Sequence, residues 1–347
     1  MSEFVEQALR GLAAQADELC RAYGPDGPGF CAALVVKGEV LAQQVHGLAH
    51  LEWQQPIDAN TRFYLASEAK PWTAAFIMRS VAAGKIALDE DVRGRLPALA
   101  SYTQPILLGH LLRHTSGIDD YLTLWHAQLG RGDHDVLQPE QALELIRRAH
   151  DVRFTPGSQY AYSNSNYVLL AELLAQLEGC SLAELAAQLC FKPWRMPSTS
   201  FERDPWRVMP RRARSYEPDP LHPGAWLDAP VPLATWGDGG LWSTLADLTQ
   251  AERQWQQDPQ VPAHELLLAR CCAEDQRFAP VGQTYRFGVE VLHHAGREFA
   301  FHGGCYASFT SLVLRCPAEQ LSLLVLSNRE GFDARGPRWL NALWGDC

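Results

Sequence analysis

The chain has 347 residues, of which 47% are hydrophobic and 20% are charged, and its formal net charge at pH 7 is -10. These values fit one large globular domain or two closely packed lobes, and they exclude a disordered chain. The negative charge, in a sequence without a basic run, also argues against nucleic acid and anionic membranes as partners.

The N-terminal stretch does not have the pattern of an export signal. Residues 4–22 follow an amphipathic helical pattern and are preceded by acidic residues, whereas a secretory signal needs a basic start and an unbroken apolar run. No run of about 18 apolar residues indicates a membrane span. We therefore expect a soluble cytoplasmic protein.

The nine cysteines also fit a reducing compartment. They form no Cys-x-x-Cys pair and no Cys/His cluster with the spacing of a zinc site. Most lie in apolar runs, where a free cysteine behaves as a small hydrophobic residue. We expect no metal ion and no cofactor.

The elements after the first helix alternate between strands and helices. Two strand-like runs at residues 30–36 and 40–47 indicate a hairpin, and a short strand over 61–65 follows. Helical patterns then dominate residues 72–250. The expected helices cover residues 72–83, 105–113, 139–149, 164–177 and 182–189. Long irregular loops are expected over 196–234, which is rich in Pro, Arg, Asp and Trp.

Strand patterns return in the last quarter of the chain, and a short helix closes it. The expected strands cover residues 285–292, 298–302, 308–315 and 321–327. Because strands at both ends enclose a helical middle, we expect an α+β fold, with one antiparallel β-sheet flanked by helices and an inserted all-α lobe. Residues 1–347 would form a single domain. Its two sub-lobes would be a sheet lobe of residues 1–66 plus 251–347 and a helical lobe of residues 67–250.

Ser67 and Lys70 form a Ser-x-x-Lys pair where the strand at 61–65 turns into a helix. Residues three apart share a helix face, so Lys70 would lie beside the Ser67 hydroxyl, at the positive end of the helix dipole. Alone the motif is weak, because a chain of this length gives about one match by chance. The simpler interpretation is a surface serine and a solvated lysine. The apolar surroundings of Lys70 favour function, because an unpaired lysine would be costly there.

A second candidate stretch contains Tyr162, Ser163 and Asn164, at a junction between a loop and a helix. Helix capping by Ser163 or Asn164 would also explain it. A third stretch, residues 302–305, has the sequence His-Gly-Gly-Cys and lies between two expected strands. Its glycines would let a substrate approach the backbone closely, or they would form a bulge or a tight turn. Residues 237–244 are interpreted as a turn before a capped helix.

In order and rough spacing, the three stretches resemble the motifs of the serine β-lactamase and penicillin-binding-protein superfamily. The Tyr-x-Asn form is similar to the branch that holds class C β-lactamases, D-peptidases and related esterases. Further landmarks of that branch occur at residues 114–117 (His-Thr-Ser-Gly), 156–157, 193–196 and 239–244. The resemblance covers nearly the whole chain. It implies the α+β fold described above, with a site in the cleft between the two lobes.

The resemblance also implies roles for the motif residues. Ser67 would attack a carbonyl group to form an acyl-enzyme, with Lys70 and Tyr162 as a coupled acid–base pair. Burial would lower the pKa of Lys70, and the nearby ammonium would lower the pKa of Tyr162, which would take the Ser67 proton. Asn164 would orient Lys70 or bind a substrate amide. The backbone N–H groups of Ser67 and Cys305 would form an oxyanion hole.

The third motif departs from the pattern of many relatives, which carry lysine where this chain has His302. A histidine is mostly neutral at pH 7, so recognition of a free substrate carboxylate beside Gly303 and Gly304 stays open. Aromatic residues near the motifs would favour an apolar acyl group if they line the cleft. They are Trp72, Tyr121, Trp125, Trp226, Trp236, Trp242 and Tyr306. Three acidic residues, Asp119, Asp120 and Asp238, would instead favour a cationic substrate.

The leading hypothesis is a serine hydrolase that cleaves an ester or amide bond of a small molecule or short peptide. An acyltransferase with the same acyl-enzyme and a β-lactamase or D,D-peptidase are the enzymatic alternatives. A non-catalytic module that binds an acyl ligand is the alternative from another class. The sequence does not fix the oligomeric state.

Overall fold

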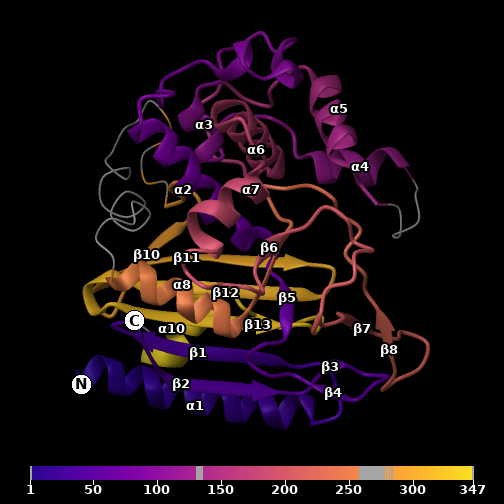
Figure 1. Ribbon diagram of the computed structural model, residues 1–347, viewed down its shortest axis with the longest axis vertical. Helices are drawn as coiled ribbons and strands as arrows, with labels where there is room; N and C mark the ends of the chain where they lie inside the picture. The colour runs from indigo at the N-terminus through magenta and orange to yellow at the C-terminus, as the bar shows by residue number, and fades with distance from the viewer. Residues whose placement is uncertain are drawn as a thin grey trace.

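A computed structural model of the protein describes residues 2–129, 136–257, 278, 280, 282 and 284–345. Its core is a six-stranded antiparallel sheet with the strand order β10-β11-β12-β13-β1-β2 (Figure 1). Two strands come from the N-terminal part, β1 (Phe30–Val36) and β2 (Glu39–His46). The others are β10 (Glu290–His294), β11 (Arg297–Tyr306), β12 (Phe309–Cys316) and β13 (Leu321–Ser327). Because β1 pairs with β13, the two ends of the chain build one sheet.

Apolar content explains the order of these strands. Every residue of β1, β12 and β13 is buried, and these central strands are rich in Val, Leu, Ala and Phe. The edge strand β2 has no fully buried residue, and its second half alternates between exposed and half-buried positions. A strand covered on both faces needs apolar residues throughout, whereas an edge strand can alternate.

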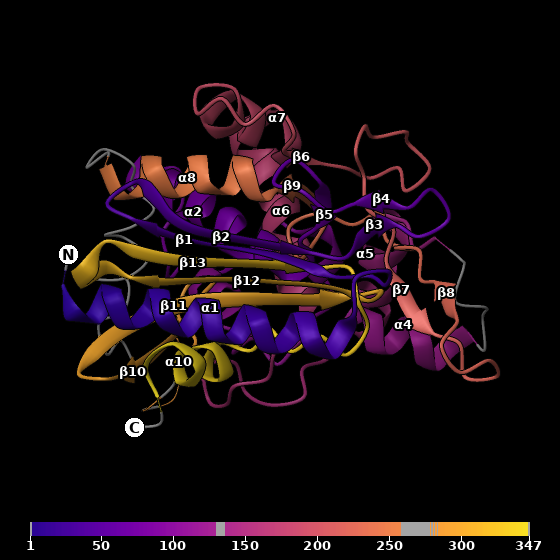
Figure 2. The ribbon, with the colours of Figure 1, turned by 90° about the horizontal axis from the view of Figure 1, so that it is seen from below.

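Helices cover both faces of the sheet (Figure 2). On one face, α1 (Glu3–Tyr23) packs against α10 (Gly336–Trp344). On the other face, α8 (Leu245–Gln257) contacts β1 and β13. A buried ion pair fixes α8 to the sheet, since Nη2 of Arg315 in β12 lies 2.7 Å from Oε1 of Glu252.

The helical lobe is built around one apolar helix, α6 (Asn164–Glu178), which contacts α2, α3, α4, α5 and α7. Most of its first eleven residues are buried, which is typical of a helix in the middle of a lobe. The surrounding helices are α2 (Ala69–Ala82), α3 (Leu108–Leu112), α4 (Tyr121–Leu129), α5 (Pro139–Ala149) and α7 (Leu182–Ala186). Figure 1 shows this lobe above the β10–β11 edge of the sheet.

Short elements connect the two lobes. A small sheet has the order β5-β9-β6, formed by β5 (Arg62–Tyr64), β9 (Leu241–Thr244) and β6 (Ser200–Phe201). Two strand pairs lie apart from it, β3 (Leu48–His50) with β4 (Gln55–Pro56) and β7 (Tyr216–Pro218) with β8 (Trp226–Asp228). The short helical turns are η1 (Ala66–Glu68), η2 (Val92–Gly94), η3 (Pro97–Leu99), η4 (Ala187–Phe191) and η6 (Pro317–Glu319).

The structure confirms the predicted α+β fold, with an antiparallel sheet from both ends of the chain and a helical middle. The predicted bounds are right for β1, α5 and β13. The division into lobes of residues 1–66 plus 251–347 and 67–250 stays a prediction. In the described part of the chain, no helix is long and apolar enough to cross a membrane.

Four local expectations were wrong. The stretch at 302–305 does not separate two strands but lies inside β11, whose ladder with β12 runs through both glycines. The stretch at 237–244 is only partly a turn, because its second half is β9. The strand expected from residue 285 begins as β10 at Glu290. The helix α4 was not expected at all.

Candidate active site

Ser67 lies in the tight turn η1, between β5 and α2, as the sequence predicts. The preceding residue, Ala66, has a φ of 48°, a left-handed conformation that costs a residue with a Cβ about 1–3 kcal/mol. Two hydrogen bonds hold this turn. The Leu65 N–H donates to the carbonyl of Leu241 at 2.9 Å, and Ser311 Oγ donates to the carbonyl of Leu65 at 2.6 Å. The fold therefore imposes the turn that presents the serine.

The Lys70 side chain is fully buried, and three oxygens surround its ammonium. Nζ donates to Ser67 Oγ at 2.9 Å, to Asn164 Oδ1 at 2.8 Å and to the backbone carbonyl of Asp238 at 2.8 Å. These partners come from η1, from the start of α6 and from the loop before β9. All three ammonium protons are thus bound, and the predicted contact between Lys70 and Ser67 is present.

Burial lowers the pKa of Lys70 to about 8, although the carboxylates of Asp238 and Asp120 oppose this change. Asp120 also fixes the amide of Asn164. Its Oδ2 accepts the backbone N–H of Asn164 at 2.6 Å and Nδ2 of the same residue at 2.9 Å. The amide oxygen of Asn164 is therefore turned toward Lys70, which fits the expectation that this residue orients the lysine.

Tyr162 lies in the loop that ends at Ser163, the N-cap residue of α6. Its phenol is close enough to the Ser67 side chain for that group to affect the pKa of Tyr162, and Lys70 Nζ lies 5.0 Å from the centre of its ring. The residue as a whole is 38% exposed, whereas its phenolic oxygen is buried. The structure thus brings together the alcohol, the ammonium and the phenol that the sequence places in three separate motif positions.

The expected lowering of the pKa of Tyr162 was wrong. Burial of the phenol raises its pKa well above the ordinary value, and the Ser67 side chain only partly opposes this rise. Nearby groups add to the rise, since Tyr167, Asp238 and Tyr160 all disfavour a phenolate. Of the predicted pair, Lys70 therefore has the pKa closer to neutrality, and Tyr162 stays a phenol.

His114, which the sequence marks only as a family landmark, lies directly behind Tyr162. The two ring centres are 4.2 Å apart. Its Nδ1 accepts the backbone N–H of Ser163 at 3.1 Å and Nδ2 of Asn166 at 3.1 Å. Burial and the charge of Lys70 hold the pKa of His114 well below its usual range, so the ring is neutral. His114 thus packs against the ring of Tyr162 and also holds the backbone of the next residue, Ser163.

His302 is buried in β11, and the hydrogen bonds of its two ring nitrogens define its tautomer. Nδ1 lies 2.7 Å from the carbonyl of Gly303, which can only accept, so Nδ1 carries the proton. Nε2 then accepts from Tyr285 Oη at 3.2 Å. Burial, and secondly the charge of Lys70, lower the pKa of His302 to about 3. This residue is therefore neutral at pH 7 and brings no cation to the site.

Gly304 brings β11 against the turn that carries the serine. A Cβ at residue 304 would lie 2.1 Å from the carbonyl oxygen of Leu65 and 2.9 Å from the backbone nitrogen of Ser67. Only glycine permits this contact, whereas a Cβ at Gly303 would meet its nearest atom at 3.4 Å. The close approach at Gly304 is therefore made by the protein's own backbone. An oxyanion hole at the N–H groups of Ser67 and Cys305 stays a prediction.

Tyr121 is fully buried, and it acts on the site through Asp238. Its Oη donates to Asp238 Oδ2 at 2.6 Å, which holds the loop whose carbonyl accepts from Lys70. Two other aromatic candidates, Trp72 and Trp242, are buried in the core. Among the described residues, no group of three His, Cys, Asp or Glu side chains is arranged to hold a metal ion.

Two contacts of the site have no clear signal in the sequence. The carbonyl of Asp238 is a backbone group, which any residue type could supply at that place. Tyr285, the partner of His302, stands outside all three motifs. His114 could have been found, because its segment was already a landmark of the resembling family.

Known proteins resemble this chain in sequence and in fold. The D-aminopeptidase of Brucella ovis is 30% identical over 312 residues, which are 88% of this chain and 57% of that protein. The chain thus spans little more than half the length of that relative. The octameric penicillin-binding protein homologue from Pyrococcus abyssi has a TM-score of 0.79 at 21% identity, covering 96% of this chain and 76% of that one. EstCE1, a hydrolase with promiscuous acyltransferase activity, has a TM-score of 0.74 at 23% identity, covering 99% of this chain and 98% of that one.

The sequence model of the Beta-lactamase family matches residues 10–343, which is nearly the whole chain. The structural likenesses support the same fold, and the motif residues meet around one buried lysine. The protein therefore belongs to the Beta-lactamase family, within the serine β-lactamase and penicillin-binding-protein superfamily.

Proposed function

We propose that the protein is a serine hydrolase that cleaves an ester or amide bond of a small molecule or short peptide through an acyl-enzyme on Ser67. One observation carries this proposal. The Nζ atom of a fully buried Lys70, whose pKa burial lowers to about 8, lies 2.9 Å from Ser67 Oγ. An amine of that pKa in that position can remove the hydroxyl proton at a pH near neutrality.

In the proposed first step, Ser67 Oγ bonds to the substrate carbonyl carbon while its proton moves to neutral Lys70. The carbonyl electron pair moves onto the oxygen, where the N–H groups of Ser67 and Cys305 would stabilise it, each by ~10²–10³-fold in rate. The phenol of Tyr162 then protonates the leaving group and takes the proton that Lys70 holds. The bond to the leaving group breaks, and the acyl group stays on Ser67.

Water then completes the reaction by the reverse proton path. It attacks the acyl carbon, passes a proton to the Lys70–Tyr162 pair, and releases a carboxylic acid as Ser67 regains its hydroxyl proton. Assigning the first proton transfer to Lys70 follows from the raised pKa of Tyr162, which keeps the phenol protonated near pH 7, so that no phenolate is present to act as the first base. Asn164 keeps Lys70 aligned throughout.

The likeness to the D-aminopeptidase of Brucella ovis favours amides of D-amino acids and short D-peptides as the first substrates to test. Because His302 is neutral, it does not supply a cation that would attract a free carboxylate. β-Lactams and D-Ala-D-Ala termini are therefore the less favoured substrates. The unpaired cysteines of the described residues favour a reducing, cytoplasmic location.

Acyl transfer is the second candidate activity. Its support is the likeness to EstCE1, whose structure is described as that of a hydrolase with promiscuous acyltransferase activity. In that case an alcohol or amine would replace water at the acyl-enzyme. Adding such acceptors to a hydrolysis assay separates the two activities by the product formed.

The acyl-enzyme is tested with a fluorophosphonate probe and intact mass spectrometry. We expect one adduct on the wild type, located by peptide mapping at Ser67, because its hydroxyl lies beside the buried amine of Lys70. The Ser67→Ala variant should give no adduct and no turnover of a chromogenic ester. The Ser158→Ala variant removes a hydroxyl that only donates to the carbonyl of Thr155, so it should react like the wild type. Full turnover by Ser67→Ala would disprove the proposal.

The pH dependence of kcat/KM tests the role of Lys70. Only the neutral amine accepts a proton, and its fraction rises with pH, so kcat/KM should rise and level off with an apparent pKa of about 8. The Lys70→Arg variant keeps the charge but cannot become neutral, and it should lose ~10²–10⁴-fold in rate. The control is Lys85→Arg, at an exposed ion pair with Glu178. A profile that is flat around pH 8 would contradict the assignment.

His114 is a positioning residue in this mechanism, and two variants separate its ring from its acceptor. His114→Phe keeps a ring against Tyr162 but removes the acceptor of the Ser163 N–H. We expect kcat to fall by about tenfold, which is ~1.4 kcal/mol, with little change in KM. His114→Asn offers an oxygen in place of Nδ1 and should recover part of kcat. Equal kcat values for His114→Phe and the wild type would show that the hydrogen bond does not position Tyr162.

A further inference from the structure

A second cavity lies outside the catalytic site, with a volume of about 380 Å³. Its walls come from Val136 before α5, the segment between β6 and β7, the end of β8 with the stretch after it, the strand β9 and the first residue of β12. The lining residues that matter are Trp206, Arg212, Val231, Leu233, Trp242 and Phe309. Neither Ser67, Lys70 nor Tyr162 lines it. Its volume is in the range of sites for small ligands, at about 300–1,000 Å³.

The floor of this cavity is apolar and rigid. Val231, Leu233, Trp242 and Phe309 are 9%, 7%, 7% and 2% exposed, and the rings of Trp242 and Phe309 pack edge to face at 5.5 Å. Trp206 is 70% exposed, so it can only stand at the mouth. An apolar or aromatic ligand group would therefore gain burial on the floor and further contact at the rim.

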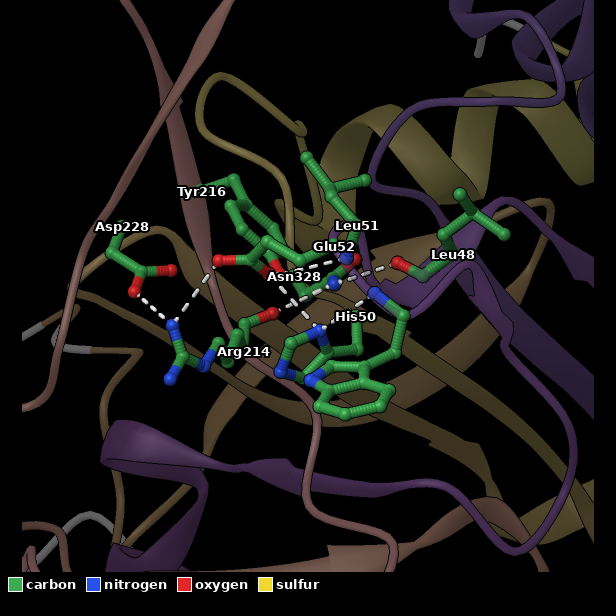
Figure 3. Close-up of polar contacts among 9 residues, drawn as sticks. Leu48, His50, Leu51, Glu52, Arg214, Tyr216, Asp228 and Asn328 are labelled. Carbon is green, nitrogen blue, oxygen red and sulfur yellow. Dashed lines mark hydrogen bonds and ion pairs between the residues drawn. The ribbon is translucent and has the colours of Figure 1, made fainter.

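Most of the charges around the cavity neutralise one another. Figure 3 shows Arg214 between the carboxylates of Asp228 and Glu52, and both are within ion-pair distance of its Nη1. Glu202 Oε2 pairs with Arg207 Nη1 at 3.0 Å. These groups offer a ligand little net charge.

Arg212 is the exception. Its half-buried guanidinium lies 5.8 Å from the centre of the Trp242 ring, and its Nη1 donates to the carbonyls of Pro205 and Arg207 at 3.0 and 3.2 Å. In the described part of the chain, its Nε and Nη2 have no hydrogen bond or ion pair. The remaining lining carboxylate, Asp204, is exposed and accepts the backbone N–H of Trp206 at 2.9 Å. A half-buried cation without a counter-ion is costly, and a bound anion would remove that cost.

We propose that this cavity binds a small amphipathic carboxylate, with the carboxylate on Nε and Nη2 of Arg212 and the apolar body over Trp242, Phe309 and Leu233. The Nε–Nη2 edge of a guanidinium presents two parallel N–H groups, which match the two oxygens of a carboxylate. The carbonyls that hold Nη1 keep this edge in a fixed orientation.

The proposed site is separate from the catalytic serine. Tyr64 stands between them, with its ring 5.3 Å from that of Trp242 and its Oη accepting the N–H of Gly240 at 3.1 Å. Gly240 follows the Asp238 loop that binds Lys70. Binding in the cavity therefore does not require Ser67, and the proposal does not depend on the proposed hydrolase activity.

Isothermal titration calorimetry on the full chain tests the proposal with phenylbutyrate as the probe. Phenylbutyramide and phenylbutylamine, which share its apolar body, are the matched neutral and cationic ligands. We expect phenylbutyrate to bind at one site, and both controls to bind at least about tenfold more weakly, because they lack the charge that pairs with a guanidinium. The Ser67→Ala variant should bind the acid as the wild type does.

Two variants locate the binding. Arg212→Gln should weaken phenylbutyrate binding by about tenfold or more, whereas Arg214→Gln, at a compensated charge, should change it by less than about threefold. Val231→Trp places a large side chain in the cavity while Arg212 is kept, and it should abolish binding. Thermal unfolding shows whether each variant is folded. If Arg212→Gln does not fold, the binding measured for Val231→Trp tests the proposal. The proposal would be overturned if phenylbutyrate gave no heat of binding at about 10 mM, or if phenylbutyramide bound with equal affinity. Binding that is unchanged in both Arg212→Gln and Val231→Trp would also overturn it.

Discussion

The burial of the Lys70 ammonium is the constraint on which the rest of the site depends. Removing an ammonium from water is costly unless oxygens replace the water at each proton. Here the three oxygens come from Ser67, Asn164 and Asp238, which are far apart in the chain. The contact with Ser67 is local, but the oxygens of Asn164 and Asp238 reach the lysine only when the helical lobe closes around it. Any shift of these segments would leave a buried donor without a partner.

Burial also sets the charge of the histidines around this ammonium. Burial, and secondly the charge of Lys70, keeps His114 and His302 neutral, so both rings serve as hydrogen-bonding and packing groups. The His114 ring accepts the backbone N–H of Ser163, and the His302 ring accepts the hydroxyl of Tyr285. Each ring therefore holds a neighbour in place. Of the basic groups near Ser67 that the structure describes, Lys70 is thus the one whose pKa lies close to neutrality. A base that can gain and lose a proton is what an acyl-transfer reaction needs.

Local spacing predicted the part of the site that a single helix or junction determines. Ser67 and Lys70 are three residues apart at the start of α2, and Tyr162 and Asn164 flank the N-cap of α6. Contacts made by tertiary structure could not be predicted in this way. The two glycines of β11 resemble a turn, but pairing with β12 keeps them in a strand. Burial raises the pKa of Tyr162, and this tertiary effect, which residue spacing does not reveal, outweighs the nearness of the phenol to Lys70.

The state of Lys70 can be measured directly, since the chain contains only four lysines. Nuclear magnetic resonance of isotope-labelled lysine side chains, recorded as a pH titration, would follow each Cε signal separately. The signal that disappears in the Lys70→Met variant should titrate with a midpoint of about 8. A midpoint for that signal near the ordinary lysine value of about 10.4 would contradict the account, because the lysine could then not be the base that activates Ser67.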